Sequence, residues 1–185
     1  MTTSMVTIIG MVGLPAVGKS VFAERLVKEF GFSHVNKDKM RNFFRDSIKY
    51  FNDADYSHHN SLIDSVNRVV IPSADILIKE LIDQDQNVII DGYGKFKDRR
   101  DRHRENLKKY NTTLIIVYVK EKEEVIIERL KKRESGENWV KHFYKKWKPG
   151  FDIPTKDECE FIIEVSPEGY EEAIEKIRKI LKKIL

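Results

Sequence analysis

The sequence has 185 residues, a length that suits one globular domain with a single hydrophobic core. Hydrophobic residues make up 41% of the chain and charged residues 35%, which excludes a disordered chain and predicts a soluble protein. The net charge of +4 and the pI of about 9.0 mildly favour polyanionic partners without requiring nucleic acid.

Neither the lone Cys159 nor the histidine pair at 58–59 has partners at metal-ligand spacing, so we interpret them as a structural thiol and as loop histidines. A single cysteine also indicates a reducing compartment. The apolar N-terminal stretch has no basic leader, is interrupted by Gly10 and Gly13, and continues into Lys19. We therefore expect no signal peptide, no membrane span and a cytoplasmic location.

The first third of the chain alternates predicted strands with predicted helices. Residues 6–12 form an apolar, β-branched run typical of a strand covered on both faces. A glycine-rich loop follows, and apolar residues then recur at helical spacing until Gly31 supplies a stop. A second strand is expected over 32–36, followed by a further helix, and a loop is expected over 50–60.

Helical periodicity continues over residues 62–82, where Pro72 predicts either two helices or one bent helix. Residues 87–92 form a third apolar strand that ends in a carboxylate, and a charged helical pattern returns over 97–110.

The last third repeats the same alternation. Residues 112–119 are the longest β-branched run, and a helix is predicted over 121–133. A fifth strand is expected over 160–165, and a last helix begins after Ser166-Pro167 with acids early and lysines late. This order predicts an α/β fold: a parallel sheet with helices on both faces, joined by right-handed crossovers.

One motif points directly to chemistry. Residues 13–20 read Gly13-Leu14-Pro15-Ala16-Val17-Gly18-Lys19-Ser20, the pattern G-x-x-x-x-G-K-S between a predicted strand and a predicted helix. The glycines allow successive N–H groups and the helix N-terminus to face phosphate oxygens. Lys19 is predicted to neutralise the β- and γ-phosphates and Ser20 to hold Mg²⁺. ATP and Mg²⁺ are the predicted cofactors.

Two aspartates follow predicted strands, at the sheet edge where α/β folds place their ligands. We assign Asp38 as the general base, and Arg41, one helical turn later, as the ligand of a substrate phosphate or a developing charge. Asp91 is assigned to Mg²⁺, directly or through water, with substrate contact as the alternative. Either aspartate could instead be a helix cap or a turn residue.

The region after residue 121 carries the features of a lid. The predicted helix ends in basic residues, and Ser135, Gly136 and several lysines follow, which predicts a mobile helical lid over about 131–150. Its closure would exclude water and bring an arginine to the transferring phosphoryl group, with Arg129 and Arg133 as candidates.

Two basic segments could contact a polyanion. Trp139, Phe143 and Trp147 recur every four residues with lysines between them, a pattern that suits single strands, although an amphipathic helix with a packed aromatic stripe is favoured. The basic run over 95–104 could bind phosphates along a backbone or form a solvated helix face with ion pairs.

On these residues the chain resembles the P-loop kinases of the polynucleotide 5′-hydroxyl kinase group, within the nucleoside-monophosphate-kinase-like superfamily. The resemblance covers nearly the whole chain, and its motifs are GLPAVGKS, VNKDKMR at 35–41, VIIDG at 88–92, KDRR at 97–100, RLKKR at 129–133 and FDIPT at 151–155. It implies a three-layer P-loop NTPase fold over residues 1–185, with the first of five parallel strands in the centre of the sheet.

The resemblance also implies roles for individual residues. It makes Asp38 the general base, places Arg41 on the acceptor phosphate, selects Arg133 as the lid arginine, and locates adenine near the lid and the final loop. The chain departs from the group after Asp91, where Gly92-Tyr93-Gly94 replaces the usual threonine and asparagine and leaves acceptor recognition open.

The leading hypothesis is an ATP-dependent kinase that transfers the γ-phosphoryl group to a hydroxyl acceptor, the 5′-OH of RNA or DNA. The alternatives are a kinase of small metabolites or aminoacylated tRNA, and a regulatory P-loop ATPase with a protein partner. The predicted catalytic residues are Lys19, Asp38, Arg41 and Arg133, and the predicted metal ligands are Ser20 and Asp91. The residues predicted to bind the nucleotide are Gly13, Ala16, Val17, Gly18, Lys19, Ser20, Val21 and Arg129.

Overall fold

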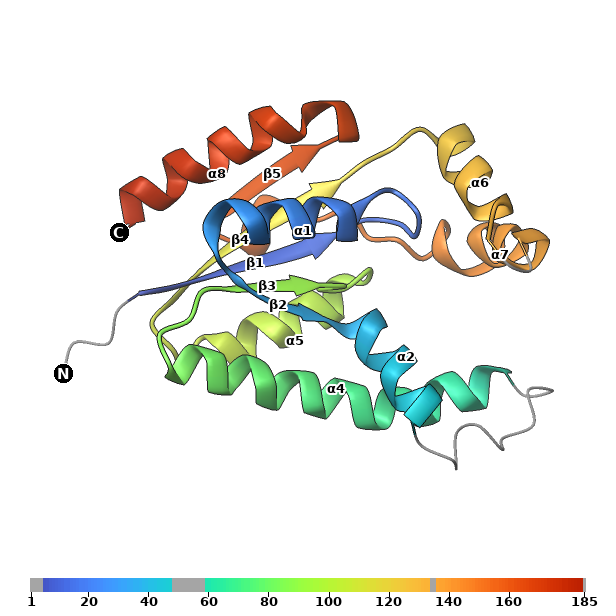
Figure 1. Cartoon of the computed structure of the whole chain (residues 1–185), viewed down its shortest axis with the longest axis horizontal. Helices are drawn as coiled ribbons and strands as arrows, with labels where there is room; N and C mark the ends of the chain where they lie inside the picture. The colour runs from blue at the N-terminus through green and yellow to red at the C-terminus, as the bar shows by residue number, and fades with distance from the viewer. Residues whose placement is uncertain (1–4, 48–58, 134–135, 185) are drawn as a thin grey trace.

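Five parallel strands form the centre of the molecule in the order β2-β3-β1-β4-β5 (Figure 1). Every residue of the central strand β1 is buried, because helices cover both of its faces. The predicted five-stranded parallel sheet with its first strand in the centre is confirmed. The strands are β1 (Val6–Val12), β2 (Ser33–Asn36), β3 (Val88–Asp91), β4 (Thr112–Val119) and β5 (Phe161–Val165).

The computed structural model describes residues 5–47, 59–133 and 136–184, and the side chains of 59–64 are not described. Within these ranges no helix is sufficiently long and apolar to cross a bilayer. The seven α-helices described are α1 (Lys19–Phe30), α2 (Lys37–Ser47), α4 (His59–Asp83), α5 (Lys97–Leu107), α6 (Glu123–Lys131), α7 (Gly136–His142) and α8 (Tyr170–Ile184).

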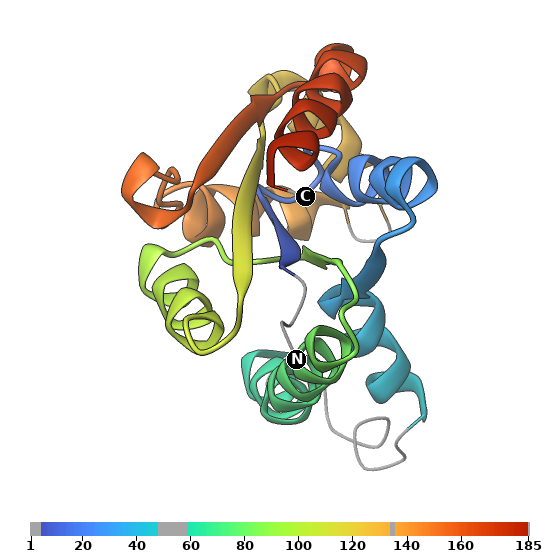
Figure 2. The same cartoon turned by 90° about the vertical axis from the view of Figure 1, so that its left-hand side faces the viewer.

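The helices form a layer on each side of the sheet (Figure 2). On one side α1 and α8 pack with α6 over Ile9 and Met11 of β1. On the other side α4 and α5 pack over Ile8 and Val12 of the same strand. Because side chains alternate along a strand, β1 contributes to both cores. The result is the predicted three-layer α/β fold.

Helix α4 is continuous from His59 to Asp83, with Pro72 inside it. Of the two forms predicted there, separate helices are wrong and a single helix is observed. Buried residues continue at four-residue spacing on both sides of the proline, which holds both halves against the body: Val66, Val70, Ala74, Ile78 and Ile82. The loop expected over 50–60 lies mostly outside the described residues, and its last two residues belong to α4.

The lid region lies beyond the carboxyl ends of the strands, on the side toward which the arrows in Figure 1 point. The predicted lid over about 131–150 follows α6 and contains α7 and the π-helix η2 (Phe143–Trp147). Phe143 is buried in the core, and Trp139 stacks on Trp147 with 5.5 Å between ring centroids. The aromatic stripe therefore packs on the protein body, as the amphipathic alternative predicts. Two short 3₁₀ helices follow, η3 (Lys156–Glu158) and η4 (Pro167–Gly169).

Candidate functional site

The glycine-rich loop joins the end of β1 to the start of α1 at the carboxyl edge of the sheet. Ala16 and Gly18 have φ values of 64° and 105°, in the left-handed region that favours glycine. A Cβ on Gly18 would lie 2.5 Å from the Tyr170 hydroxyl oxygen, so space as well as conformation requires glycine there. Lys19 extends back along the loop, and its Nζ donates to the Leu14 carbonyl at 2.7 Å.

A cavity of about 690 Å³ opens at this loop and gathers most of the predicted site residues. It is lined by residues of the phosphate loop, of the end of β1 and the loop after β3, of α2 and α6, of the lid, and of the start of α8. The predicted residues among them are Gly13, Ala16, Gly18, Lys19, Ser20, Val21, Asp38, Arg41, Arg129 and Arg133.

Two predicted residues do not line this cavity. The Val17 side chain is buried in the core, so only its backbone is available to a phosphate. Asp91 lies at the end of β3 with 5% of its surface exposed.

Lys19 is held in a crowded electrostatic environment. Burial lowers the pKa of Lys19 to about 8, although the carboxylates of Asp91 and Asp38 act in the opposite direction. The Arg133 guanidinium adds a smaller effect that also lowers it. A phosphate bound in the loop would stabilise the ammonium form of Lys19.

Asp91 is an ionised carboxylate in a buried position. Burial alone would raise its pKa, but contacts with His34 and Ser20 and the charge of Lys19 outweigh that effect, and the pKa of Asp91 lies below its ordinary value. The Ser20 hydroxyl and the Asp91 carboxylate therefore lie together at the loop. Mg²⁺ in nucleotide sites takes one or two such oxygen ligands besides phosphate and water, so this pair fits the ion.

Asn36 is a residue of this site to which sequence reasoning gave no role. Its Nδ2 donates to Asp91 Oδ2 at 2.8 Å, and its Oδ1 accepts from the Lys39 backbone N–H at 2.8 Å. The second contact caps the first turn of α2. Asn36 thus joins the end of β3 to the helix that carries Asp38. An asparagine at a predicted strand end, directly before a helix, was the available signal.

Asp38 and Arg41 face the cavity from the first turns of α2. The Asp38 side chain is 82% exposed and forms an ion pair with Arg41. Arg41 is anchored from behind, because its Nε donates to Asn67 Oδ1 of α4 at 2.7 Å. This arrangement gives an accessible carboxylate next to a fixed guanidinium.

The two lid arginines occupy different positions. Arg129 braces the phosphate loop, since its Nη1 donates to the Ala16 carbonyl and its Nη2 to Glu121, each at 3.0 Å. Arg133 lies over the Trp139 ring, 5.5 Å from its centroid, and lines the cavity. Arg129 therefore shapes the loop, while Arg133 faces the space where phosphates would lie.

In the loop after β3, Gly92-Tyr93-Gly94 departs from the usual sequence of the polynucleotide kinases, and packing accounts for the tyrosine. Tyr93 is fully buried, and its ring occupies the place of a side chain at Gly10, where a Cβ would lie 2.7 Å from Tyr93 Cγ. Its side chain is consequently unavailable to an acceptor. Gly92 and Gly94 line the cavity without side chains of their own.

For the basic run over 95–104 the sequence left two alternatives, phosphate binding along a backbone and a solvated helix face with ion pairs. The contacts favour the helix face with ion pairs. Arg100 pairs with Glu158, Arg104 with Asp101, and Lys97 with Asp157. Lys95, from the same run, lines the cavity. The histidine pair lies outside the residues with described side chains.

The sequence matches the model of the family AAA_33, described as an AAA domain, over residues 8–145. The chain belongs to this family. The AAA_33 match spans the phosphate loop, Asp38, Asp91 and both lid arginines. No curated protein matches the sequence significantly.

Solved structures share the fold of this AAA_33 chain. A protein from Chloroflexus aurantiacus J-10-fl, provisionally described as a kinase, superimposes with a TM-score of 0.80 at 16% identity over 100% of both chains. An unliganded sugar kinase from Janibacter sp. HTCC2649 gives 0.61 at 17% identity, covering 96% of this chain and 95% of that chain. At these identities the two structures establish a shared fold and no more.

Nucleotide affinity should fall as the pH rises through about 8, the pKa to which burial lowers Lys19. Above that pH the free protein lacks the ammonium that faces the phosphates, so the dissociation constant of an ATP analogue should rise by up to about tenfold per pH unit. Titration calorimetry with Mg²⁺ and a non-hydrolysable analogue measures this. Lys19→Arg keeps its charge and should give a flat profile. A profile as steep as that of the wild type would contradict the assignment.

Two substitutions of Asn36 should distinguish the effect of its contact with α2 from the effect of its contact with Asp91. Asn36→Ser keeps a capping oxygen and should be more stable than Asn36→Ala by about 1 kcal/mol in urea unfolding. Both variants leave Asp91 without its donor and should weaken Mg²⁺-nucleotide binding to a similar degree. Asn87→Ala is the control: Asn87 Oδ1 accepts from the Thr7 N–H at 2.7 Å, and neither residue lines the cavity. Unchanged Mg²⁺-nucleotide binding in Asn36→Ala would show that Asn36 has a structural role only.

Proposed function

We propose that the protein is an ATP-dependent kinase that transfers the γ-phosphoryl group of ATP to a hydroxyl acceptor. The observation that carries the proposal is that one cavity contains the phosphate loop with Lys19 and also the accessible Asp38 carboxylate. Membership of AAA_33 and the kinases of the same fold support it. In this proposal residues 1–185 form one kinase domain, and residues 131–150 act as its lid.

The proposed reaction assigns one task to each charged group. The phosphate loop binds the β- and γ-phosphates, Lys19 neutralises their charge, and Arg133 contacts the transferring phosphoryl group. Asp38 accepts the proton of the acceptor hydroxyl as its oxygen attacks the γ-phosphorus in line, and the bond to the ADP oxygen breaks. Ser20 and Asp91 would hold Mg²⁺, whose charge, when bound, offsets that of the phosphate oxygens.

The ion pair of Asp38 with Arg41 suits this role. An acceptor with an anionic group near its hydroxyl would accept from Arg41 Nη1 in place of Asp38 and leave the Asp38 carboxylate available for the proton. Arg41 can stay in place during this exchange because Asn67 holds its Nε. The pair would thus favour acceptors that carry a phosphate.

For the acceptor we propose the 5′-OH end of RNA or DNA, bound at its terminal nucleotide. Arg41, Lys95 and Arg133 add positive charge to the cavity beside Lys19, which suits a hydroxyl next to a phosphate. The ion pairs of the 97–104 run and the packed aromatic stripe leave less surface for a long strand. A phosphorylated small metabolite fits the same positive wall, and the sugar kinase of the same fold favours it as the second candidate.

The direct test incubates the protein with γ-labelled ATP, Mg²⁺ and matched acceptors, and follows the label. The panel contains 5′-OH RNA and DNA of increasing length beside sugars and phosphorylated metabolites. Label on 5′ ends, with activity that depends little on strand length, supports the proposed acceptor. Label confined to a metabolite replaces it with the second candidate. Inorganic phosphate as the only labelled product, whatever the acceptor, would overturn the kinase proposal in favour of an ATPase.

Asp38→Asn should lower kcat by about a hundredfold or more, because general bases contribute about 10²–10⁴-fold. Binding of an ATP analogue should change little, since the amide keeps the size of the carboxylate. Asp46→Asn is a matched control on the same helix, with the same change of charge at a residue that does not line the cavity. Steady-state rates and calorimetry measure the two effects. Normal turnover by Asp38→Asn would remove it as the base.

A further inference from the structure

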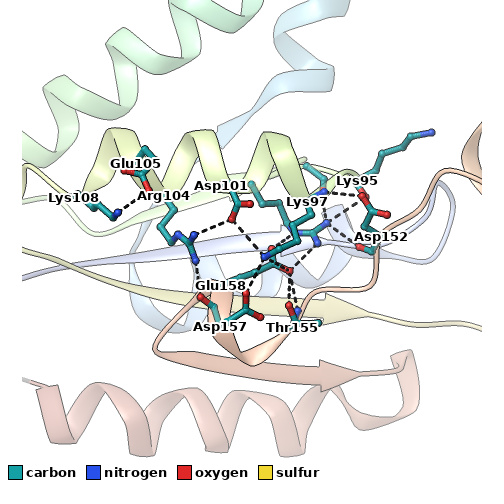
Figure 3. Close-up of polar contacts among 12 residues, drawn as sticks. Lys95, Lys97, Asp101, Arg104, Glu105, Lys108, Asp152, Thr155, Asp157 and Glu158 are labelled. Carbon is teal, nitrogen blue, oxygen red and sulfur yellow. Dashed lines mark hydrogen bonds and ion pairs between the residues drawn. The ribbon is translucent and has the colours of Figure 1, made fainter.

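Two motifs of the sequence have no role in the proposed reaction, KDRR at 97–100 and FDIPT at 151–155. The structure brings them together between α5 and the segment that follows the lid. Figure 3 shows Lys95 and Lys97, from the α5 side, next to Asp152, Thr155 and Glu158. The contacts between the two segments converge on Arg100 and Glu158.

Arg100 is 1% exposed, and all three nitrogen atoms of its guanidinium donate hydrogen bonds. Nε donates to Glu158 Oε2 at 2.6 Å and Nη2 to Oε1 at 3.0 Å, a bidentate pair. Nη1 donates to the carbonyls of Asp152 at 2.9 Å, Lys95 at 3.2 Å and Gly94 at 3.4 Å. Glu158 also accepts from the backbone and the hydroxyl of Thr155.

A buried ion pair does not by itself stabilise a fold, because the desolvation of both charges cancels much of their attraction. Two apolar side chains could fill the same space, but they could not donate hydrogen bonds to the carbonyls of the loop after β3 and of the segment after the lid. The specific effect of Arg100 is therefore to fix these two stretches of backbone relative to each other.

Lys95 is the residue that both stretches position. Its carbonyl accepts from Arg100 and from the Asp152 N–H, the latter at 3.0 Å. Its Nζ donates to the Lys146 carbonyl of η2 at 2.5 Å. Lys95 also lines the cavity. It therefore links the cavity wall to the lid.

We propose that Arg100 and Glu158 are a positioning pair for phosphoryl transfer, which sets the Lys95 ammonium in the cavity wall where it contacts phosphate oxygens. The pair itself touches no substrate and acts through Lys95. The inference rests on the kinase function proposed above and concerns two residues that do not themselves line the cavity.

Neighbouring acids provide the matched test. Glu158→Gln removes the charge that pairs with Arg100, and Asp157→Asn makes the same change one residue earlier in η3, where Asp157 pairs with Lys97 on the surface. Glu158→Gln should lower kcat/KM for the acceptor by about tenfold to a hundredfold, with ATP affinity unchanged. Asp157→Asn should stay within about twofold of wild type.

A double-mutant cycle with Lys95→Met separates positioning from structural damage. If the pair acts through Lys95, Glu158→Gln should change the rate less than about twofold in the Lys95→Met background. Equal losses in both backgrounds would overturn the proposal. Where Glu158→Gln fails to fold, Arg100→Lys keeps the charge and loses the bidentate contact, and it enters the same cycle.

Hydrogen exchange in the full chain gives a readout that needs no acceptor. Glu158→Gln should speed exchange at residues 93–96 and 146–152 and leave the phosphate loop at 13–20 unchanged, whereas Asp157→Asn should change neither. Unchanged exchange at both stretches would overturn the positioning pair even in an active kinase. A wild-type protein that transfers no phosphoryl group would overturn the kinase function alone.

Discussion

The candidate site depends on keeping one ionised carboxylate, Asp91, at the buried end of β3. A buried charge is costly unless opposite charge and hydrogen bonds compensate it. Here Lys19 supplies the charge, and Asn36 and Ser20 contact the carboxylate. The phosphate loop, the helix that carries Asp38 and the end of β3 are therefore held in one arrangement by the groups that satisfy Asp91.

Positive charge is divided between structure and site, so the net charge of +4 is a poor guide to function. Arg100 and Arg104 sit on α5, in the basic run over 95–104, yet carboxylates and carbonyls engage them. Arg133 and Lys95 contribute to the cavity. The number of cations in a segment matters less than which of them the fold leaves facing open space.

Much of the fold could be predicted because its signals are local. The strands are short β-branched runs, and β1 leads into a loop whose glycines are required by backbone conformation and space. The contact of Arg100 with Glu158, 58 residues away, could not be predicted, because each lies in a charged stretch typical of a surface. The same holds for Asn36, whose partner Asp91 lies 55 residues away. Long-range polar pairs leave no periodicity in a sequence.

The two sides of the cavity are built differently, and this difference bears on the acceptor. On the nucleotide side, side chains hydrogen-bond the backbone of the phosphate loop: Arg129 donates to the Ala16 carbonyl, and Tyr170 donates to the Gly18 carbonyl at 3.1 Å. On the other side Gly92 has a φ of 79° and no atom within 4 Å of its Cβ position. That side is lined by the backbone of Gly92 and Gly94 and by the charged side chains of Asp38, Arg41 and Lys95. For the kinase proposed above, the phosphate loop would hold the nucleotide, and the loop after β3 together with α2 would determine which acceptor enters.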